Sequence, residues 1–231
     1  MLTIPRRGLV LDLPLNWDAK DYSWNWHDGT PTDVAWVETN IGYQSKCASF
    51  NGSSSYVDCW KWDGSNIYTI SFRMFTSKDI TSTTSWQWII NTSTSDDGFS
   101  WWIWIWNISW YADNETLCIW DWKHNDYWRT YIKDIIPAWR HFIIFVFNWE
   151  TYDIYVDLLK KQTYIWWDPN GTACRALKFN SIYIWKDEDN NYFNWLIQNI
   201  RIYNRVLTEP EIRTLYLEWL RKLTPARNVY L

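Results

Sequence analysis

The chain has 231 residues, of which 47% are hydrophobic, 20% aromatic and 21% charged. The presence of only 7 Gly and 7 Pro excludes collagen-like and low-complexity classes, and the hydrophobic content excludes intrinsic disorder. A net charge of −4 without a long basic stripe argues against nucleic acid as a partner. The longest uncharged apolar-looking run, at 98–112, is 15 residues long, so we expect no membrane span.

At the N-terminus, residues 1–7 lead into an apolar segment at 8–11. Asp12 and Pro14 end this segment before any small residues typical of a cleavage site. The sequence therefore predicts no signal peptide in this chain.

Short runs of β-branched and aromatic residues dominate from residue 8 to about residue 206, with clusters of Asn, Asp, Ser, Thr and Gly between them. This pattern is typical of an all-β sandwich or barrel. The predicted strands are 8–13, 46–50, 55–60, 67–75, 86–90, 99–106, 117–122, 141–147, 152–157, 177–184 and 195–203.

The four cysteines, at 47, 59, 118 and 174, are spaced too widely for a typical zinc site. If residues 51–55 form a hairpin loop, Cys47 and Cys59 oppose each other, and a cross-strand disulfide fits there. Cys118 and Cys174 then remain as the second pair. Four cysteines allow three connectivities, and four free buried thiols in a reducing cytosol are the alternative.

Tryptophan recurs at i, i+2 spacing, which on a strand places each set on one face. The sets are Trp24/Trp26, Trp60/Trp62, Trp86/Trp88, Trp102/Trp104/Trp106 and Trp120/Trp122. Trp60/Trp62, Trp86/Trp88 and Trp120/Trp122 alternate with Lys61, Gln87 and Asp121, so these three pairs are interpreted first as inward faces of half-buried strands.

The strand at 101–106 differs because neither of its faces is polar. Only one face of each sheet in a sandwich meets the core, so the other must meet a ligand, a subunit or the chain's own tail. We predict that Trp102, Trp104 and Trp106, with Trp120 and Trp122 from a neighbouring strand, form an exposed platform that contacts carbohydrate or another subunit.

A helix is predicted at 209–223. Thr208 and Glu211 form a capping box, with Pro210 in the first turn. An apolar stripe follows at Ile212, Leu215, Tyr216, Trp219, Leu220 and Leu223. We expect one domain over 8–224 that includes this helix, with an N-terminal tail at 1–7 and a C-terminal tail at 225–231.

Several segments resemble the concanavalin A-like, laminin-G-like jelly-roll family in the family's order. They are Gly8–Leu13, Ala48–Gly52 with Tyr56-Val57, Tyr68–Phe72, Trp139–His141, Ile154–Asp157 and Tyr192–Thr208 followed by Glu211-Ile212. The resemblance implies a two-sheet antiparallel jelly-roll sandwich. It also implies relatives that mostly bind sugars or proteins, some with a structural calcium, and a minority that cleave glycans.

Calcium is disfavoured because the chain departs from the family at two carboxylates. Asn51 stands where relatives often carry Asp, and Trp195–Asn199 stands where they carry Gly-x-Ile-Asp-Glu. The acidic run at 187–191 starts like an EF-hand loop but lacks its Gly and its bidentate Glu, at Tyr192 and Gln198. It is interpreted as a solvated turn, and we expect no cofactor or metal site.

No catalytic residue is predicted. A retaining glycosidase needs two closely spaced carboxyl groups, and no predicted strand carries the alternating acids of the family's glucanases. His27, His124 and His141 lack a recognisable nucleophile arrangement, and His141 is interpreted as structural.

The sequence therefore predicts a non-catalytic, lectin-like glycan-binding protein, multivalent through copies of itself, at an extracellular or virion surface. The first alternative is a structural subunit of a filament, held together by its Trp-rich faces and tails. The second alternative is a glycoside hydrolase.

Overall fold

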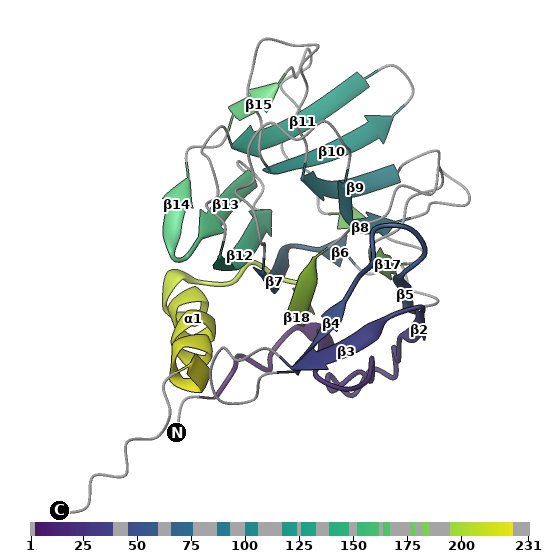
Figure 1. The fold of residues 1–231 in the computed structure, drawn as a ribbon. Helices are drawn as coiled ribbons and strands as arrows, with labels where there is room; N and C mark the ends of the chain where they lie inside the picture. Colours follow the sequence, from purple (N-terminus) through teal and green to yellow (C-terminus); the bar gives the residue numbers. More distant parts are fainter. Residues whose placement is uncertain are drawn as a thin grey trace, which may run out of the picture.

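The computed structural model describes residues 3–38, 46–59, 66–75, 87–92, 100–105, 117–123, 126–132, 139–147, 152–161, 164–166, 177–178, 182–184 and 195–223. Within these residues, two antiparallel sheets form a sandwich and one helix lies against it (Figure 1). The structure confirms the predicted all-β, two-sheet antiparallel jelly-roll class with a C-terminal helix.

The first sheet has the order β14 (Leu159–Lys161), β13 (Tyr152–Val156), β12 (Arg140–Phe147), β7 (Thr69–Phe75), β18 (Leu196–Tyr203), β4 (Lys46–Ser49) and β3 (Ala35–Glu38), and β1 (Leu9–Leu13) also pairs with β18. The second sheet has the order β15 (Tyr164–Trp166), β11 (Asp126–Ile132), β10 (Leu117–Lys123), β9 (Ser100–Ile105), β8 (Gln87–Thr92), β17 (Ile182–Ile184), β5 (Tyr56–Cys59) and β2 (Thr30–Thr32). A short ladder joins β6 (Asn66–Ile67) to β16 (Leu177–Lys178).

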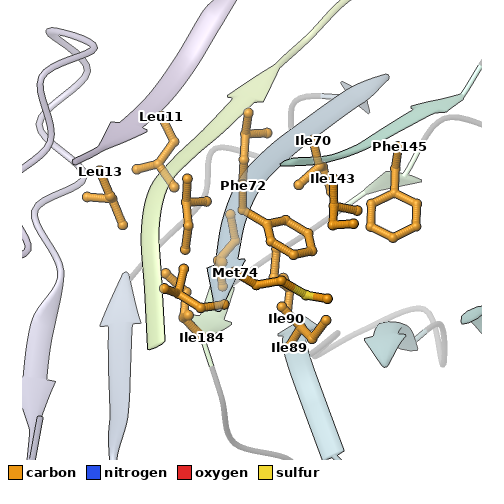
Figure 2. Packing of buried hydrophobic residues seen from close by; sticks show 14 of the residues in the cluster. Leu11, Leu13, Ile70, Phe72, Met74, Ile89, Ile90, Ile143, Phe145 and Ile184 are labelled. Carbon is orange, nitrogen blue, oxygen red and sulfur yellow. The ribbon is translucent and has the colours of Figure 1, made fainter. Parts of the chain in front are cut away.

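The main core lies between the two sheets. Ile70, Phe72 and Met74 alternate along β7, so they share its inner face. They belong to one buried cluster with Ile89 and Ile90 of β8 (Figure 2). Both neighbouring isoleucines are buried because the pairing of β8 with β9 shifts at this point, as in a β-bulge.

The outer face of the first sheet is also buried along its central strands, because helix α1 (Glu209–Leu223) lies against it. Phe142 and Ile144 of β12 form a second apolar cluster with Leu215 and Trp219 of α1. The rings of Phe142 and Trp219 stack with centroids 6.1 Å apart. This second layer explains why β12 is buried at every position from 141 to 147 instead of alternating.

A buried network of four charged side chains lies between α1 and the first sheet. Arg73 Nη2 donates to Glu218 Oε2 at 2.7 Å, and Arg201 Nε donates to Asp12 Oδ1 at 2.9 Å. Arg201 Nη1 also reaches Glu218 Oε2, at 3.4 Å. All four residues are at most 6% exposed.

Burial lowers the pKa of Arg73, although Glu218 opposes the shift. Burial also acts against the charge of Arg201, but Asp12 and Glu218 outweigh it and raise its pKa. The network therefore depends on both carboxylates, because an unpaired buried charge is strongly destabilising.

The start of α1 shows the Glu211 half of the predicted capping box. The backbone N–H and the hydroxyl of Thr208 both donate to Glu211 Oε2, at 2.9 and 3.0 Å, and Ile212 N donates to Thr208 O at 2.9 Å. Arg205 adds a two-pronged ion pair to the same carboxylate. Hydrogen bonds from Arg205 and Thr208 lower the pKa of Glu211 to about 2.

The predicted hairpin between residues 46 and 60 is wrong. β4 pairs with β3 and β18 in the first sheet, whereas β5 pairs with β2 and β17 in the second. Ala48 and Val57 belong to the same core cluster, so these strands face each other through side chains instead of backbone hydrogen bonds. The segment 50–55 thus crosses from one sheet to the other.

The predicted Cys47–Cys59 disulfide is therefore also wrong. Cys59 belongs to the core cluster, whereas Cys47 lies on β4 beside the core residue Ala48 and, by strand alternation, on the other face. Both thiols are free and buried. Burial raises the pKa of Cys47 to about 12 and raises that of Cys59 further.

We predict that Glu218→Leu lowers the free energy of unfolding by about 3–5 kcal/mol, because it leaves two buried guanidinium groups without this carboxylate. Urea titration followed by tryptophan fluorescence measures the change. Glu209→Gln, at an exposed position of the same helix, is the control and should stay within about 0.5 kcal/mol. Equal effects of the two variants would contradict the network's role.

A second prediction concerns the thiols. Cys47 and Cys59 should resist iodoacetamide in the folded protein, because burial disfavours the reactive thiolate. Both should be alkylated after unfolding without any reductant, as read by peptide mass spectrometry. A peptide pair joined through these two cysteines in a non-reduced digest would contradict the structure.

Candidate functional site

The strand register brings four predicted tryptophans to one face of the second sheet. Trp102 of β9 lies directly opposite Trp120 of β10, and Ser100 lies opposite Trp122. Trp104 is two residues from Trp102, so it shares the same face. We call the surface formed by Trp88, Trp102, Trp104, Trp120 and Trp122 the outer aromatic face; Trp88 enters it because it pairs with Trp104.

This face is turned away from the core. Ile103, between the two β9 tryptophans, lies opposite Ile90 of β8, and Ile90 is buried in the core cluster. Directly paired residues project to the same side of a sheet, so the positions of Ile103 and Ile90 share the inner side. Trp102 and Trp104 then occupy the outer side.

The register extends this face to strands that the sequence analysis missed. Arg129 of β11 lies opposite Trp120 on one side and Trp166 of β15 on the other. Tyr127 lies opposite Trp122. The sequence did carry a signal for this strand: the aromatic run at 127–131 starts only four residues after Lys123, as the return strand of a tight hairpin would.

Other predicted site residues are placed only in part. Cys118 lies on β10 opposite Trp104 and Tyr131. Trp106, Cys174, the acidic run 187–191 and the tail 225–231 lie outside the described residues. The predicted pairing of Cys118 with Cys174 stays a prediction.

Two residues at positions where a calcium site would need a carboxylate, Asn51 and Gln198, have other roles in the structure. Asn51 Oδ1 accepts backbone N–H bonds from Ser53, Ser54 and Ser55 at 2.9 to 3.1 Å and so organises the crossing loop. Gln198 Nε2 donates to Lys46 O at 2.6 Å and links β18 to β4. Neither supplies the carboxylate that calcium prefers. Across the described ranges, no group of three His, Cys, Asp or Glu side chains could hold a metal ion.

His141 lies in a structural contact. Its Nδ1 is 2.7 Å from Asp157 Oδ2, and the other oxygen of Asp157 accepts the Phe142 N–H at 2.9 Å. This pair joins β12 to the turn that follows β13. The arrangement agrees with the structural interpretation of this histidine.

The i, i+2 spacing of Trp24 and Trp26 does not mark a strand. Both lie in the loop between β1 and β2, and they are 82% and 88% exposed. Alternation along a strand does not apply to them because this segment is not extended: both have positive φ, 76° and 61°.

No family model and no curated protein matches the chain. Similar solved structures include domain 4 of a GH43 extracellular arabinanase from Geobacillus stearothermophilus in complex with arabinotriose. The TM-score is 0.64 at 17% identity, over 90% of this chain and 98% of that one.

Botulinum neurotoxin binding domains are also similar. The serotype D ligand binding domain in complex with N-acetylneuraminic acid has a TM-score of 0.64 at 18% identity, over 92% of this chain and 51% of that one. The serotype C1 binding domain has a TM-score of 0.65 at 15% identity, over 91% and 52%. This chain spans about half the length of these neurotoxin domains. At such identities the likeness shows a shared fold.

The strand register predicts which side of β9 is buried, and two substitutions test this prediction. We predict that Ile103→Ala lowers the free energy of unfolding by about 2–5 kcal/mol, as core truncations do, whereas Trp104→Ala lowers it by less than about 1 kcal/mol. Chemical unfolding of both variants measures this. The reverse order would place the tryptophans in the core.

Proposed function

We propose that this protein is a non-catalytic carbohydrate-binding protein and that its outer aromatic face contacts the sugar. The observation that carries the proposal is the pairing of Trp102 with Trp120 and of Trp104 with Trp88 on the side opposite the core. Tryptophan suits a sugar because its flat apolar ring packs on C–H groups while its indole N–H can donate to a hydroxyl.

The arrangement of the two sheets supports this location. The outer face of the first sheet is covered by α1 and its apolar cluster. The register puts the aromatic rows on the outer side of the second sheet, and an aromatic surface of this kind, where it is open to solvent, is typical of a binding site. Arg129, a residue type that can donate hydrogen bonds to hydroxyls, lies at a register position in the same row as Trp120 and Trp166.

The comparisons support a sugar as the ligand class. The arabinanase domain was solved with arabinotriose, and the serotype D domain with N-acetylneuraminic acid. These ligands belong to those proteins, and they supply a precedent for sugar binding on this fold.

The filament alternative loses part of its basis. Residues 3–7 were expected to form a tail, but Ile4 packs against the cluster under α1. Arg6 Nη1 donates to Tyr22 O at 3.0 Å. An N-terminal segment bound to its own domain is less available to extend a neighbour's sheet.

We also propose an extracellular setting with several copies acting together. The proposed sugar binding supports this setting, and so does the likeness to a domain of an extracellular arabinanase. A Cys47–Cys59 disulfide does not contribute to the argument, because both thiols are free. Display on a virion surface is one form of this setting. Several copies would add avidity of about 10² to 10⁴ to a weak single site.

The test is a glycan array followed by titration of the best ligand. Trp104→Ala should weaken binding by about 2 kcal/mol, as truncation of a central aromatic anchor does, or roughly thirtyfold in Kd. Trp139→Ala, an exposed tryptophan beside β12 of the other sheet, is the matched control and should bind normally.

The proposal would be contradicted if Trp104→Ala bound the glycan as tightly as the wild type, or if the wild type bound no glycan on the array. Release of reducing sugar from the bound polysaccharide would favour the hydrolase alternative.

A further inference from the structure

A second aromatic surface lies far from the outer aromatic face. The loop of residues 14–29 connects β1 of the first sheet to β2 of the second. It exposes four rings, which we call the loop aromatics: Trp17 at 58%, Tyr22 at 51%, Trp24 at 82% and Trp26 at 88%. In Figure 1 the purple chain leading to β2 lies at the bottom, whereas β9, β10 and β11 lie at the top.

The loop is held in one conformation by side chains within it. The Asp21 carboxylate accepts four hydrogen bonds, from Asp12 N, Ser23 N, Ser23 Oγ and His27 N, at 2.7 to 3.1 Å. Asn25 Nδ2 donates to the carbonyls of Leu9 and Val10, at 3.1 and 3.2 Å. Asn25, between the two most exposed tryptophans, is therefore held against β1 by hydrogen bonds.

The backbone at both tryptophans is in the left-handed region, with φ of 76° at Trp24 and 61° at Trp26. This conformation is energetically unfavourable for a non-glycine residue, so it carries a cost. Rings that are more than four-fifths exposed recover little of that cost by packing within the domain. Backbone strain at exposed side chains, imposed by surrounding hydrogen bonds, is typical of a functional contact.

The charges around the loop favour a neutral partner. Asp18, Asp21 and Asp28 lie in the loop, against Lys20 of the loop, Arg6 beside Tyr22, and Lys46, whose Nζ lies over the Trp17 ring. These three negative and three positive charges balance, so an anionic lipid, a nucleic acid or a sialylated sugar gains no net attraction from this surface. A neutral sugar suits exposed indole rings bordered by carboxylate and amide groups, which accept and donate hydrogen bonds to hydroxyls.

We propose that Trp24 and Trp26 form a second carbohydrate contact, selective for neutral glycans and separate from the outer aromatic face. This inference rests on the proposed function. β2 is the edge strand of the second sheet and lies three strand positions from β8, the nearest strand of the outer aromatic face, and five from β10, which at the usual spacing is about 14 Å and about 24 Å. Two contacts so far apart suit a long polysaccharide or neighbouring glycan chains on one surface, where avidity adds to affinity.

The experiment compares the full chain with a Trp24→Ala/Trp26→Ala variant, using Trp104→Ala and Trp139→Ala for reference. Each is titrated against the immobilised neutral polysaccharide that the array selects. The loop variant should melt within a few degrees of the wild type, because both rings are exposed. It should bind at least about tenfold more weakly, whereas Trp139→Ala should bind normally.

Unchanged binding of the loop variant, together with a loss in Trp104→Ala, would overturn this inference and leave the proposed function standing. A loss in the loop variant with full binding by Trp104→Ala would instead move the sugar contact from the sheet to the loop. Absence of glycan binding by the wild type would overturn both.

Three more results would overturn the inference by assigning the loop to another occupant. They are loop-dependent binding to phosphatidylcholine vesicles with glycan binding intact, loop-dependent self-association by sedimentation velocity, and a loop-dependent preference for sialylated over neutral glycans.

Discussion

The buried charge network between α1 and the first sheet is the constraint on which the rest of the structure depends. Arg73 and Arg201 project from adjacent strands of that sheet, and Asp12 and Glu218 neutralise them where water is excluded. The network and the apolar contacts of Trp219 hold the helix in place, so the central strands β7, β12 and β18 of the first sheet are covered on both faces. The aromatic rows lie on the second sheet, on the side that the register turns away from the core.

The two sheets thus divide the roles of the domain. The first is a scaffold whose central strands are buried on both faces, as the unbroken burial of β12 indicates. The second faces the core through aliphatic residues such as Ile90 and Ile184, while the register places Trp102, Trp104 and Trp120 on its other side. No helix among the described residues is long and apolar enough to cross a membrane. The exposed aromatic rings of the loop before β2 extend the binding potential to another part of the surface.

Local patterns predicted much of this fold, because they report directly on backbone geometry. Alternation at 101–106 identified the two faces of β9, and Thr208 with Glu211 identified the start of α1. The pairing of β4 and β5 was mispredicted because the same alternating pattern serves a hairpin and a pair of strands that face each other across a core. A short polar loop such as 51–55 fits both arrangements, and only the partner strands distant in sequence decide between them.

The loop aromatics were missed for a related reason. Their i, i+2 spacing is that of a strand, but the hydrogen bonds of Asp21 and Asn25 impose left-handed turns at Trp24 and Trp26.

The most direct test of the central claim is an indole ¹⁵N NMR titration with a neutral oligosaccharide. The account predicts shifts for Trp102, Trp104 and Trp120 and none for Trp219, which α1 buries against the first sheet. Shifts at Trp219, with those three indoles unmoved, would contradict it.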